Sequence, residues 1–242
     1  MIFFPGIFHP SAAPRFPRCM VSVNVLRRRV SDFSPGDWIM DSGAFTEVAR
    51  HGGYREGVAA YAEQIARWSS CGTLVAAVAQ DWMCEPFVLA RTGMTTADHQ
   101  RLTIDRYDAL RPLVGAYVMP VIQGYHPTEY AAHVRAYGDR LAPGAWVGVG
   151  SVCKRNANPD AVVAVLVAIM GERPDLRLHG FGVKLTALSD PRVRGLLWSA
   201  DSMAWSFAAR RNGRNANDHG EAIAYAERVA TRSAGPAQPL LL

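Results

Sequence analysis

Four polar side chains in this sequence follow apolar runs, and their types suit nucleophilic or acid–base chemistry. Asp41 follows WIM, Asp81 follows LVAAVAQ and Asp201 follows LLWSA, while Gln123 follows YVMPVI. A carboxylate at such a position must be solvated, paired or functional, because burying an isolated charge is costly. Any one of these acids is also explained as a helix N-cap or a solvated loop residue. Together, three acids and an amide at successive strand ends are harder to explain in this way, and they predict a shared functional site.

Glycine and other residues accompany these four positions. The further candidate site residues are Ser42, Gly43, Phe45, Gly124, Gly148, Gly150, His179, Gly180 and Lys184. A glycine has no side chain, so the sequence predicts that the backbone at Gly148, Gly150 and Gly180 faces a ligand, with amides that hydrogen-bond a flat heterocycle. Close packing inside a barrel explains any one of these glycines about as well.

Basic residues outnumber acidic ones, and almost all of them are arginine. The 242 residues include 26 Lys and Arg against 21 Asp and Glu, and only two of the 26 are lysine, which leaves 24 arginines. Arginine forms bidentate contacts with phosphates, so a polyanionic partner is permitted. Arg210, Arg211 and Arg214 follow shortly after Asp201 and are the predicted phosphate contacts. A general compositional bias toward arginine explains the excess equally well.

The elements that must position these residues are visible as short apolar runs that alternate with helical segments. Eight runs indicate strands, at residues 1–4, 20–26, 38–43, 74–81, 116–124, 146–151, 178–184 and 196–202. Helices are indicated at residues 53–70, 96–113, 126–141, 158–172 and 218–232, and the prolines at 8–19 exclude a helix there. This alternation is typical of parallel α/β folds. The sequence predicts a single-domain (β/α)8 TIM barrel over residues 1–232 and a tail at 233–242, with a doubly wound open sheet as the alternative.

The cysteine pattern and the hydropathy exclude several other classes. Cys19, Cys71, Cys84 and Cys153 have no paired spacing, which argues against zinc motifs and a disulfide framework. We therefore expect no metal and no other cofactor. Scattered reduced thiols suit a cytoplasmic protein. The apolar opening MIFFPGIFHP is too short to span a bilayer, so no membrane partner is expected.

The order of the motifs resembles the tRNA-guanine transglycosylase family. The motifs are DSGAF at 41–45, QDWMCEP at 80–86, PVIQG at 120–124, VGVGS at 147–151, HGFGVK at 179–184 and SADSMAWSFAARRNGRN at 199–215. They follow the family order over positions 38–215, and DSGAF, QG and the stretch from Asp201 to RNGRN are the most specific part. The resemblance implies a (β/α)8 barrel that replaces guanine in a polynucleotide with a 7-deazaguanine.

The resemblance also implies roles for the matched residues. Asp201 corresponds to the nucleophile that attacks the sugar C1′, and Asp41 to the acid that handles protons on the departing and incoming bases. Phe45 corresponds to the aromatic residue that stacks on the base, and Asp81 with Gln123 to the side chains that read its Watson–Crick edge. The other substrate-binding candidates are Ser42, Gly43, Gly124, Gly148, Gly150, His179, Gly180 and Lys184, and Arg210, Arg211 and Arg214 lie where the family holds the nucleic-acid backbone.

Three departures from the family pattern bear on the substrate. Ala44 replaces the second glycine of the usual DSGG, and His179 lies where the family has an apolar residue that covers the base. The zinc subdomain that helps to dock tRNA, with its Cys-x-Cys-x-x-Cys and later His, is not found after the arginine stretch. The better match is therefore the short, DNA-modifying, DpdA-like branch of phages and bacterial modification systems. The expected compartment is the bacterial or phage-infected host cytoplasm.

The sequence thus predicts a DNA-guanine transglycosylase, a glycosyltransferase that inserts a base such as preQ0 through a covalent Asp201–sugar intermediate. DNA and the 7-deazaguanine base are the expected partners, while helper proteins and the oligomeric state are left open. Three alternatives remain: the same chemistry on tRNA, a barrel that binds nucleic acid without turnover, and a glycosylase of free nucleosides or nucleotides. The presence of Asp41 and Asp201 argues against the second, and the arginine stretch argues against the third.

Overall fold

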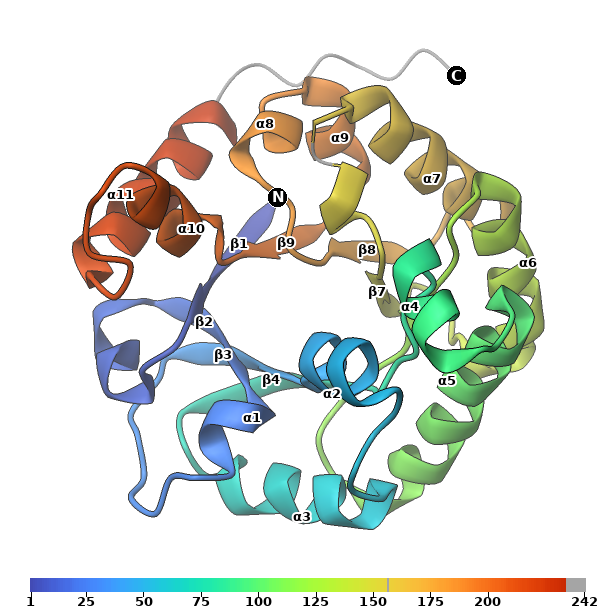
Figure 1. The fold of residues 1–242 in the computed structure, drawn as a ribbon, viewed down its shortest axis with the longest axis horizontal. Coiled ribbons are helices and arrows are strands. Elements are labelled where there is room, and N and C mark those ends of the chain that lie inside the picture. Colours follow the sequence, from blue (N-terminus) through green and yellow to red (C-terminus); the bar gives the residue numbers. More distant parts are fainter. Residues whose placement is uncertain (156, 234–242) are drawn as a thin grey trace.

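Parallel strands form a ring in the computed structural model, which describes residues 1–155 and 157–233 (Figure 1). The strands are β1 (Ile2–Ile7), β2 (Arg18–Ser22), β3 (Asp37–Asp41), β4 (Thr73–Val78), β5 (Val118–Met119), β6 (Val121–Ile122), β7 (Trp146–Val149), β8 (Arg177–Gly180) and β9 (Ser199–Ser202). They pair in the order β5-β4-β3-β2-β1-β9-β8-β7-β6, and helices surround the ring. The predicted α/β TIM barrel is confirmed, and the open doubly wound sheet is excluded.

Pro120 explains why the ring contains nine strands where the sequence predicts eight. β5 and β6 are the two halves of one apolar run, and they pair with β4 and β7 respectively. Proline has no backbone N–H and interrupts the ladder at this point. Its carbonyl oxygen nevertheless accepts a hydrogen bond from the N–H of Gly148 at 2.8 Å. The run therefore continues through Pro120 and joins the two edges of the sheet.

Helices pack around the strands where the helical segments predict them. The predicted five are α3 (Val58–Trp68), α5 (Thr96–Leu110), α6 (Pro127–Tyr137), α7 (Pro159–Glu172) and α11 (His219–Ser233). Six shorter helices are not predicted: α1 (Val23–Leu26), α2 (Ala44–His51), α4 (Pro86–Thr92), α8 (Leu185–Leu188), α9 (Pro191–Leu196) and α10 (Ala204–Arg211). Segments of four to eight residues show too little periodicity to be recognised. α1 takes the second half of the strand expected at 20–26.

Short 3₁₀ helices of three to six residues are also present in the described chain. They span Pro10–Arg15, Arg111–Leu113, Gly138–Arg140 and Cys153–Arg155. The first contradicts the expectation that the proline-rich stretch 8–19 contains no helix, because Pro10 occupies the start of the helix, where a missing N–H is tolerated. Of the predicted tail, Ser233 belongs to α11 and residues 234–242 lie outside the described residues. None of the helices in the described ranges combines the length and the apolar character that crossing a bilayer requires.

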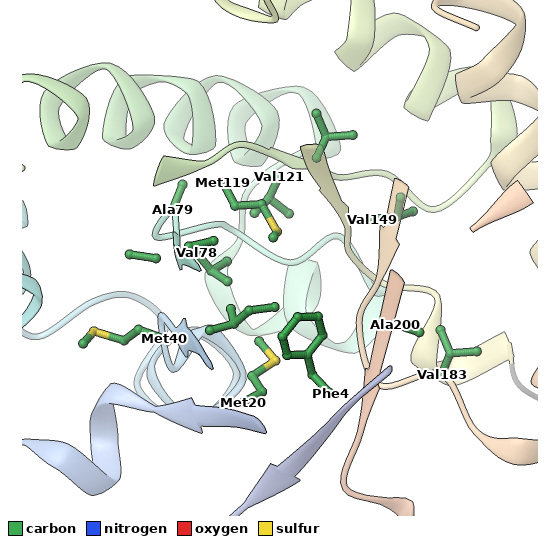
Figure 2. Close-up of a cluster of buried hydrophobic side chains, with 14 of the residues drawn as sticks. Phe4, Met20, Met40, Val78, Ala79, Met119, Val121, Val149, Val183 and Ala200 are labelled. Carbon is green, nitrogen blue, oxygen red and sulfur yellow. The ribbon is translucent and has the colours of Figure 1, made fainter. Parts of the chain in front are cut away.

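Large apolar side chains fill the inside of the barrel. In Figure 2, Phe4, Met20 and Met119 point into the space between the strands, whereas Met40 points away from it. All four side chains are buried. Side chains alternate along a strand, so Asp41 faces inward because its neighbour Met40 faces the helices. The alternation of β3 thus delivers a carboxyl group to the end of the barrel interior.

Helix α2 lies across one end of the barrel (Figure 1). A separate small apolar cluster fixes it there, formed by Ala44, Val48, Trp82, Met83 and Val88. Glu47 of α2 is fully buried and pairs with Arg55 at 2.7 Å and with Arg27 at 3.4 Å. The hydrogen bond from Arg55 holds the pKa of Glu47 at about 2. The helix that begins directly after Asp41, Ser42 and Gly43 is therefore anchored by both apolar and ionic contacts.

Candidate active site

A cavity of about 430 Å³ lies at the carboxyl ends of the strands, where barrel enzymes carry their chemistry. The carboxyl groups of Asp41, Asp81, Glu85 and Asp201 line it. Asp41 ends β3 and Asp201 lies in β9, whereas Asp81 and Glu85 come from the connection between β4 and α4. Among the described residues that line the cavity, none is lysine or arginine. Four acids without a cation favour a neutral or positively charged ligand and disfavour a phosphate inside the cavity.

Asp201 is held through one of its two carboxylate oxygens. Gly182 donates its backbone N–H to Oδ1 at 3.0 Å, and His179 Nε2 lies 3.5 Å from the same atom. Within the described residues, Oδ2 has no hydrogen-bond partner. A carboxylate that is oriented through one oxygen and has the other available is suited to nucleophilic attack.

His179 supports Asp201 from inside the barrel. Its Nδ1 lies 2.8 Å from Ser199 Oγ, and that oxygen accepts the indole N–H of Trp146 at 2.8 Å. Ser199 therefore has its hydroxyl hydrogen available for Nδ1, which places the ring hydrogen on Nε2, toward Asp201. The expectation that His179 binds the base stays a prediction. His179 is fully buried and does not line the cavity; Phe181, two residues further along the chain, does.

Asp41 lies where burial favours its neutral form. Loss of solvent raises the pKa of Asp41 to about 6, and the negative charge of Asp201 adds to the rise. Hydrogen bonds from Ser22 and from the Gly43 N–H, which lies 3.1 Å from Oδ2, act in the opposite direction. A carboxyl group whose pKa lies close to neutrality can both give and take a proton at physiological pH.

Asp81 and Gln123 form a coupled pair on the wall of the cavity. Gln123 donates from Nε2 to Asp81 Oδ2 at 2.5 Å, and Ser42 donates from Oγ to Asp81 Oδ1 at 3.3 Å. Burial raises the pKa of Asp81 to about 7, against the effect of the hydrogen bond from Gln123. An amide beside a carboxyl group offers donors and acceptors in one plane, which suits the Watson–Crick edge of a purine.

Two phenylalanines provide flat apolar surface in the cavity. Phe45 of α2 and Phe181 both line it, and Phe45 keeps 52% of its surface exposed. The ammonium group of Lys154 lies 5.4 Å from the centre of the Phe45 ring and 5.5 Å from that of Phe87. Exposed aromatic rings next to cations are suited to stack on bases whose phosphates lie nearby.

The family comparison agrees with this arrangement of carboxyl, amide and aromatic groups. The family model for DpdA, deoxypurine in DNA protein A, matches residues 13–232. The chain belongs to the DpdA family. Among the curated proteins, the comparison finds none that matches the chain. Membership in the DpdA family supports a DNA-modifying enzyme of the transglycosylase type.

Sequence reasoning did not select two polar residues of the DpdA site. Glu85 is 1% exposed, and Ser151 bridges it to Gln123. Ser151 is the one non-glycine residue in the described ranges with a positive φ, 58°, a conformation that is costly for a residue with a side chain. Burial of an acid and backbone strain are properties of the folded chain, so the sequence did not single out Glu85, and Ser151 showed only its place after the apolar run WVGVG.

Two of the candidate glycines in the DpdA barrel have backbone amides that already form hydrogen bonds within the barrel. The amides of Gly148 and Gly150 donate to the carbonyl oxygens of Pro120 and Ile122 at 2.8 and 3.0 Å, so they are not available to a heterocycle. A Cβ on Gly148 would lie 2.3 Å from the Phe181 ring, and one on Gly150 would lie 2.1 Å from Gln123 Nε2. These two glycines therefore make room for cavity-lining side chains, because the barrel ladder already uses their amides.

Five other candidates are not among the residues that line the cavity. Ser42 contacts Asp81 and Gly43 contacts Asp41, as described above. Gly124 allows close approach of Tyr130, whose Cδ2 would lie 2.9 Å from an added Cβ. Gly180 packs against Val183 and Leu197. Lys184 precedes α8, and its ammonium group lies 5.7 Å from the centre of the exposed Phe207 ring.

The three candidate arginines lie at and after the end of α10, the helix that comes directly after the strand of Asp201. Arg210 and Arg211 are exposed in the last turn of α10, the helix after β9. Arg214 is exposed too, but its guanidinium pairs with Glu221. Arg210 and Arg211 are therefore the two members of this group whose side chains form no ion pair with a described residue.

No group of three or more His, Cys, Asp or Glu side chains in residues 1–155 and 157–233 has the arrangement of a metal site. The expectation of metal-free and cofactor-free chemistry stays a prediction.

Replacing Gly150 with alanine is expected to weaken binding of a 7-deazaguanine base by about tenfold to a hundredfold. The added Cβ would displace the Gln123 amide, which then loses its contacts with Asp81 and Ser151. The test is the dissociation constant by calorimetry, with the thermal unfolding midpoint as a check on the fold. Gly171→Ala is the matched control, because an added Cβ there meets nothing within 4 Å. An unchanged affinity in the Gly150 variant would show that the Gln123 amide does not bind the base.

Proposed function

We propose that this DpdA protein is a DNA-guanine transglycosylase that exchanges guanine in DNA for a 7-deazaguanine base such as preQ0. The observation that carries the proposal is the single cavity that holds Asp41, Asp81 and Asp201 together with Gln123. Asp201 and Asp41 are 160 positions apart in the chain, yet the charge of one raises the pKa of the other. The DpdA family match supplies DNA as the polymer.

We assign recognition of the base to Asp81 and Gln123, which are hydrogen-bonded to each other. Ionised Asp81 accepts hydrogen bonds from the N1–H and the 2-amino group of guanine. The Gln123 amide has two hydrogens, of which one is directed to Asp81. The second hydrogen donates to O6 of the base. Phe45 and Phe181 supply apolar surface for the ring, which must leave the helical stack to reach the cavity.

Exchange proceeds by two displacements at C1′ of the sugar. In the first, Asp201 forms an ester bond to C1′ while the bond from C1′ to guanine N9 breaks, and neutral Asp41 gives its proton to the departing guanine. In the second, N9 of the incoming base loses its proton to ionised Asp41 and attacks C1′, which releases Asp201. Two inversions restore the original configuration. The acidic lining of the cavity stabilises the positive charge that builds up on the sugar in both steps.

The direct test is incorporation of base into polymer. The protein is incubated with radiolabelled guanine, or with preQ0, and with duplex DNA, single-stranded DNA or tRNA, followed by nucleoside mass spectrometry. The proposal expects the label and the modified nucleoside in DNA. Modification of tRNA alone would replace the proposed substrate, and release of guanine without insertion would indicate a glycosylase. Absence of both reactions, with DNA binding retained, would indicate a barrel without turnover.

Phosphates of the bound DNA are expected to contact the basic residues around the cavity. Removing two phosphate contacts reduces the slope of log affinity against log salt by about 1 to 2. We expect this reduction both for Lys154→Ala with Lys184→Ala and for Arg210→Ala with Arg211→Ala. The measurement is fluorescence anisotropy with a labelled oligonucleotide over a salt series.

The matched control for these two pairs is Arg111→Ala with Arg177→Ala. It also removes two positive charges, but Arg177 begins β8 and Arg111 lies beside it on a second cavity, at the opposite end of the strands. An equal loss of slope in the control would show that binding is not confined to the end of the barrel that holds Asp201. An unchanged slope in the Arg210 and Arg211 variant would remove the predicted phosphate role of those arginines.

A further inference from the structure

The proposed exchange assigns a role to Asp41, Asp81 and Asp201. Glu85 is the fourth acid that lines the cavity, and it has no role in that reaction. It immediately precedes α4 and caps that helix through its backbone only, because its side chain makes no capping hydrogen bond. The side chain is 1% exposed, lines the cavity and lies near Lys154 and Arg155, whose positive charges partly offset its burial. A buried acid on the wall of a binding cavity calls for a partner.

One oxygen of Glu85 has no partner at all among the described residues. Oε2 is bonded to Ser151 Oγ at 3.0 Å, whereas Oε1 is buried and makes no hydrogen bond. Ser151 Oγ in turn lies 2.9 Å from Gln123 Oε1, and Gln123 Nε2 reaches Asp81. A row of hydrogen bonds therefore runs from Asp81 through Gln123 and Ser151 to an oxygen of Glu85, and the other Glu85 oxygen is unused.

The hydrogens in this row are consistent with a neutral Glu85. Gln123 directs its NH₂ to Asp81, so its oxygen faces Ser151 and needs the Ser151 hydroxyl hydrogen. The Cys84 N–H donates to Ser151 Oγ at 3.2 Å, and a hydrogen on Glu85 Oε2 supplies the remaining contact. Burial raises the pKa of Glu85, which favours this form. With its hydrogen on Oε2, Glu85 presents Oε1 as a carbonyl oxygen, which accepts from an amine or amide N–H.

The order of the row matches the order of groups along one edge of a 7-deazaguanine. In the proposed pose, N1 and the 2-amino group face Asp81 and O6 faces Gln123. The next position along the same edge is the substituent on C7, which is adjacent to O6 across the ring junction. Ser151 and Glu85 follow Gln123 in the row of hydrogen bonds that begins at Asp81. A substituent on C7 would therefore reach the unused oxygen of Glu85.

We propose that Glu85 is the residue that selects the incoming base by its C7 substituent, accepting a hydrogen bond from a group that carries N–H, such as aminomethyl, and so favouring such a base over one with hydrogen at C7. This inference rests on the proposed function, because the pose of the base comes from it. A base without the substituent leaves Glu85 Oε1 unpaired in the closed site, which is costly. Glu85 would thereby distinguish the modified base from plain 7-deazaguanine.

The experiment compares incorporation of three bases that differ at one position: 7-deazaguanine, its 7-cyano form and its 7-aminomethyl form. For the wild-type protein, kcat/KM for the 7-aminomethyl base is expected to exceed that for plain 7-deazaguanine by about tenfold to a hundredfold. Glu85→Leu should bring this ratio close to 1. Glu85→Gln should retain a preference, because an amide can also donate or accept. Glu63→Gln, on the exposed face of α3, is the control and should leave all three values unchanged.

The outcomes separate this inference from the function it rests on. Absence of guanine incorporation into DNA by the wild-type protein would contradict the proposed function itself. Incorporation of guanine without any preference among the three bases would overturn the role of Glu85 and leave the function standing. A folded Glu85→Leu variant that keeps the wild-type ratio would overturn it too. If Glu85→Leu does not fold, the test rests on the wild-type ratio of kcat/KM between the 7-aminomethyl base and plain 7-deazaguanine, and on the same ratio in Glu85→Gln.

Discussion

Replacing Asp201 with asparagine is expected to reduce base exchange in DNA by at least about a thousandfold. An amide is a poor nucleophile and cannot form the ester to C1′. Asparagine keeps the size of the side chain, and its oxygen can still accept the Gly182 N–H that now binds Oδ1. The fold and DNA binding should therefore persist, so that the loss is a loss of chemistry. Incorporation of radiolabelled guanine into DNA measures the effect.

Covalent trapping gives a second readout for the same variant. Wild-type protein incubated with DNA and no incoming base, then denatured, should yield a protein–DNA adduct on a gel, and Asp201→Asn should yield none. Asp105→Asn is the matched control, because Asp105 is an exposed acid of α5 that pairs with Arg101, far from the residues that line the cavity in the described structure. Near-normal exchange by the Asp201 variant, or an adduct that survives in it, would contradict the assignment of Asp201 as nucleophile.

The barrel was predictable because its strands are buried on both faces and read as continuous apolar runs. All eight runs contribute to the ring, and the one that carries Pro120 is split without leaving it. The short helices were not predictable in the same way. α2 is held by contacts with Trp82, Met83 and Val88, residues that lie more than thirty positions away in the chain. Such a helix is stabilised by tertiary packing, and its sequence alone does not identify it.

The site was predictable where chemistry is tied to strand ends. Asp41 and Asp201 reach one cavity because parallel strands deliver their carboxyl ends to the same side of the sheet. The role of His179 was not predictable, since the depth of a residue inside the barrel depends on strand tilt and stagger. His179 lies below Asp201 whereas Phe181 of the same motif lines the cavity. The role of the glycines was not predictable, because their spacing is the same whether they expose an amide or admit a side chain.

Burial of acids in the cavity links catalysis to stability. The pKa of Asp81 rises from its ordinary 3.8 to about 7 in the folded protein, chiefly through loss of solvent. Between these two values the folded protein binds more protons than the unfolded chain, so stability falls as the pH rises. The contribution is favourable at low pH and is lost by the time the pH passes about 7. The difference between the two pKa values corresponds to a decrease of roughly 4 kcal/mol in the free energy of unfolding from Asp81 alone.

Asp81→Asn is therefore expected to make the protein more stable than the wild type at pH 8, by a few kcal/mol. Asparagine carries no charge to desolvate; its oxygen can accept from Gln123 and its NH₂ can donate to Ser42, the two groups that now contact Asp81. The advantage should disappear toward pH 4, where Asp81 is neutral in the folded wild-type protein. Urea unfolding at a series of pH values measures the difference, and base exchange should be lost in the same variant.

A control of opposite sign comes from the exposed end of α5. The hydrogen bond from the Thr95 side chain lowers the pKa of Asp98, so its contribution to stability is present at neutral pH and is lost as the pH falls. Asp98→Asn should therefore cost stability at pH 7 and not at low pH, the reverse of Asp81→Asn. If both variants showed the same pH dependence, the effect would not come from the local environments of the two acids. If Asp81→Asn were less stable than wild type at pH 8, the ionised Asp81 carboxylate would not destabilise the folded protein. The predicted effect of its desolvation in the cavity would then be wrong.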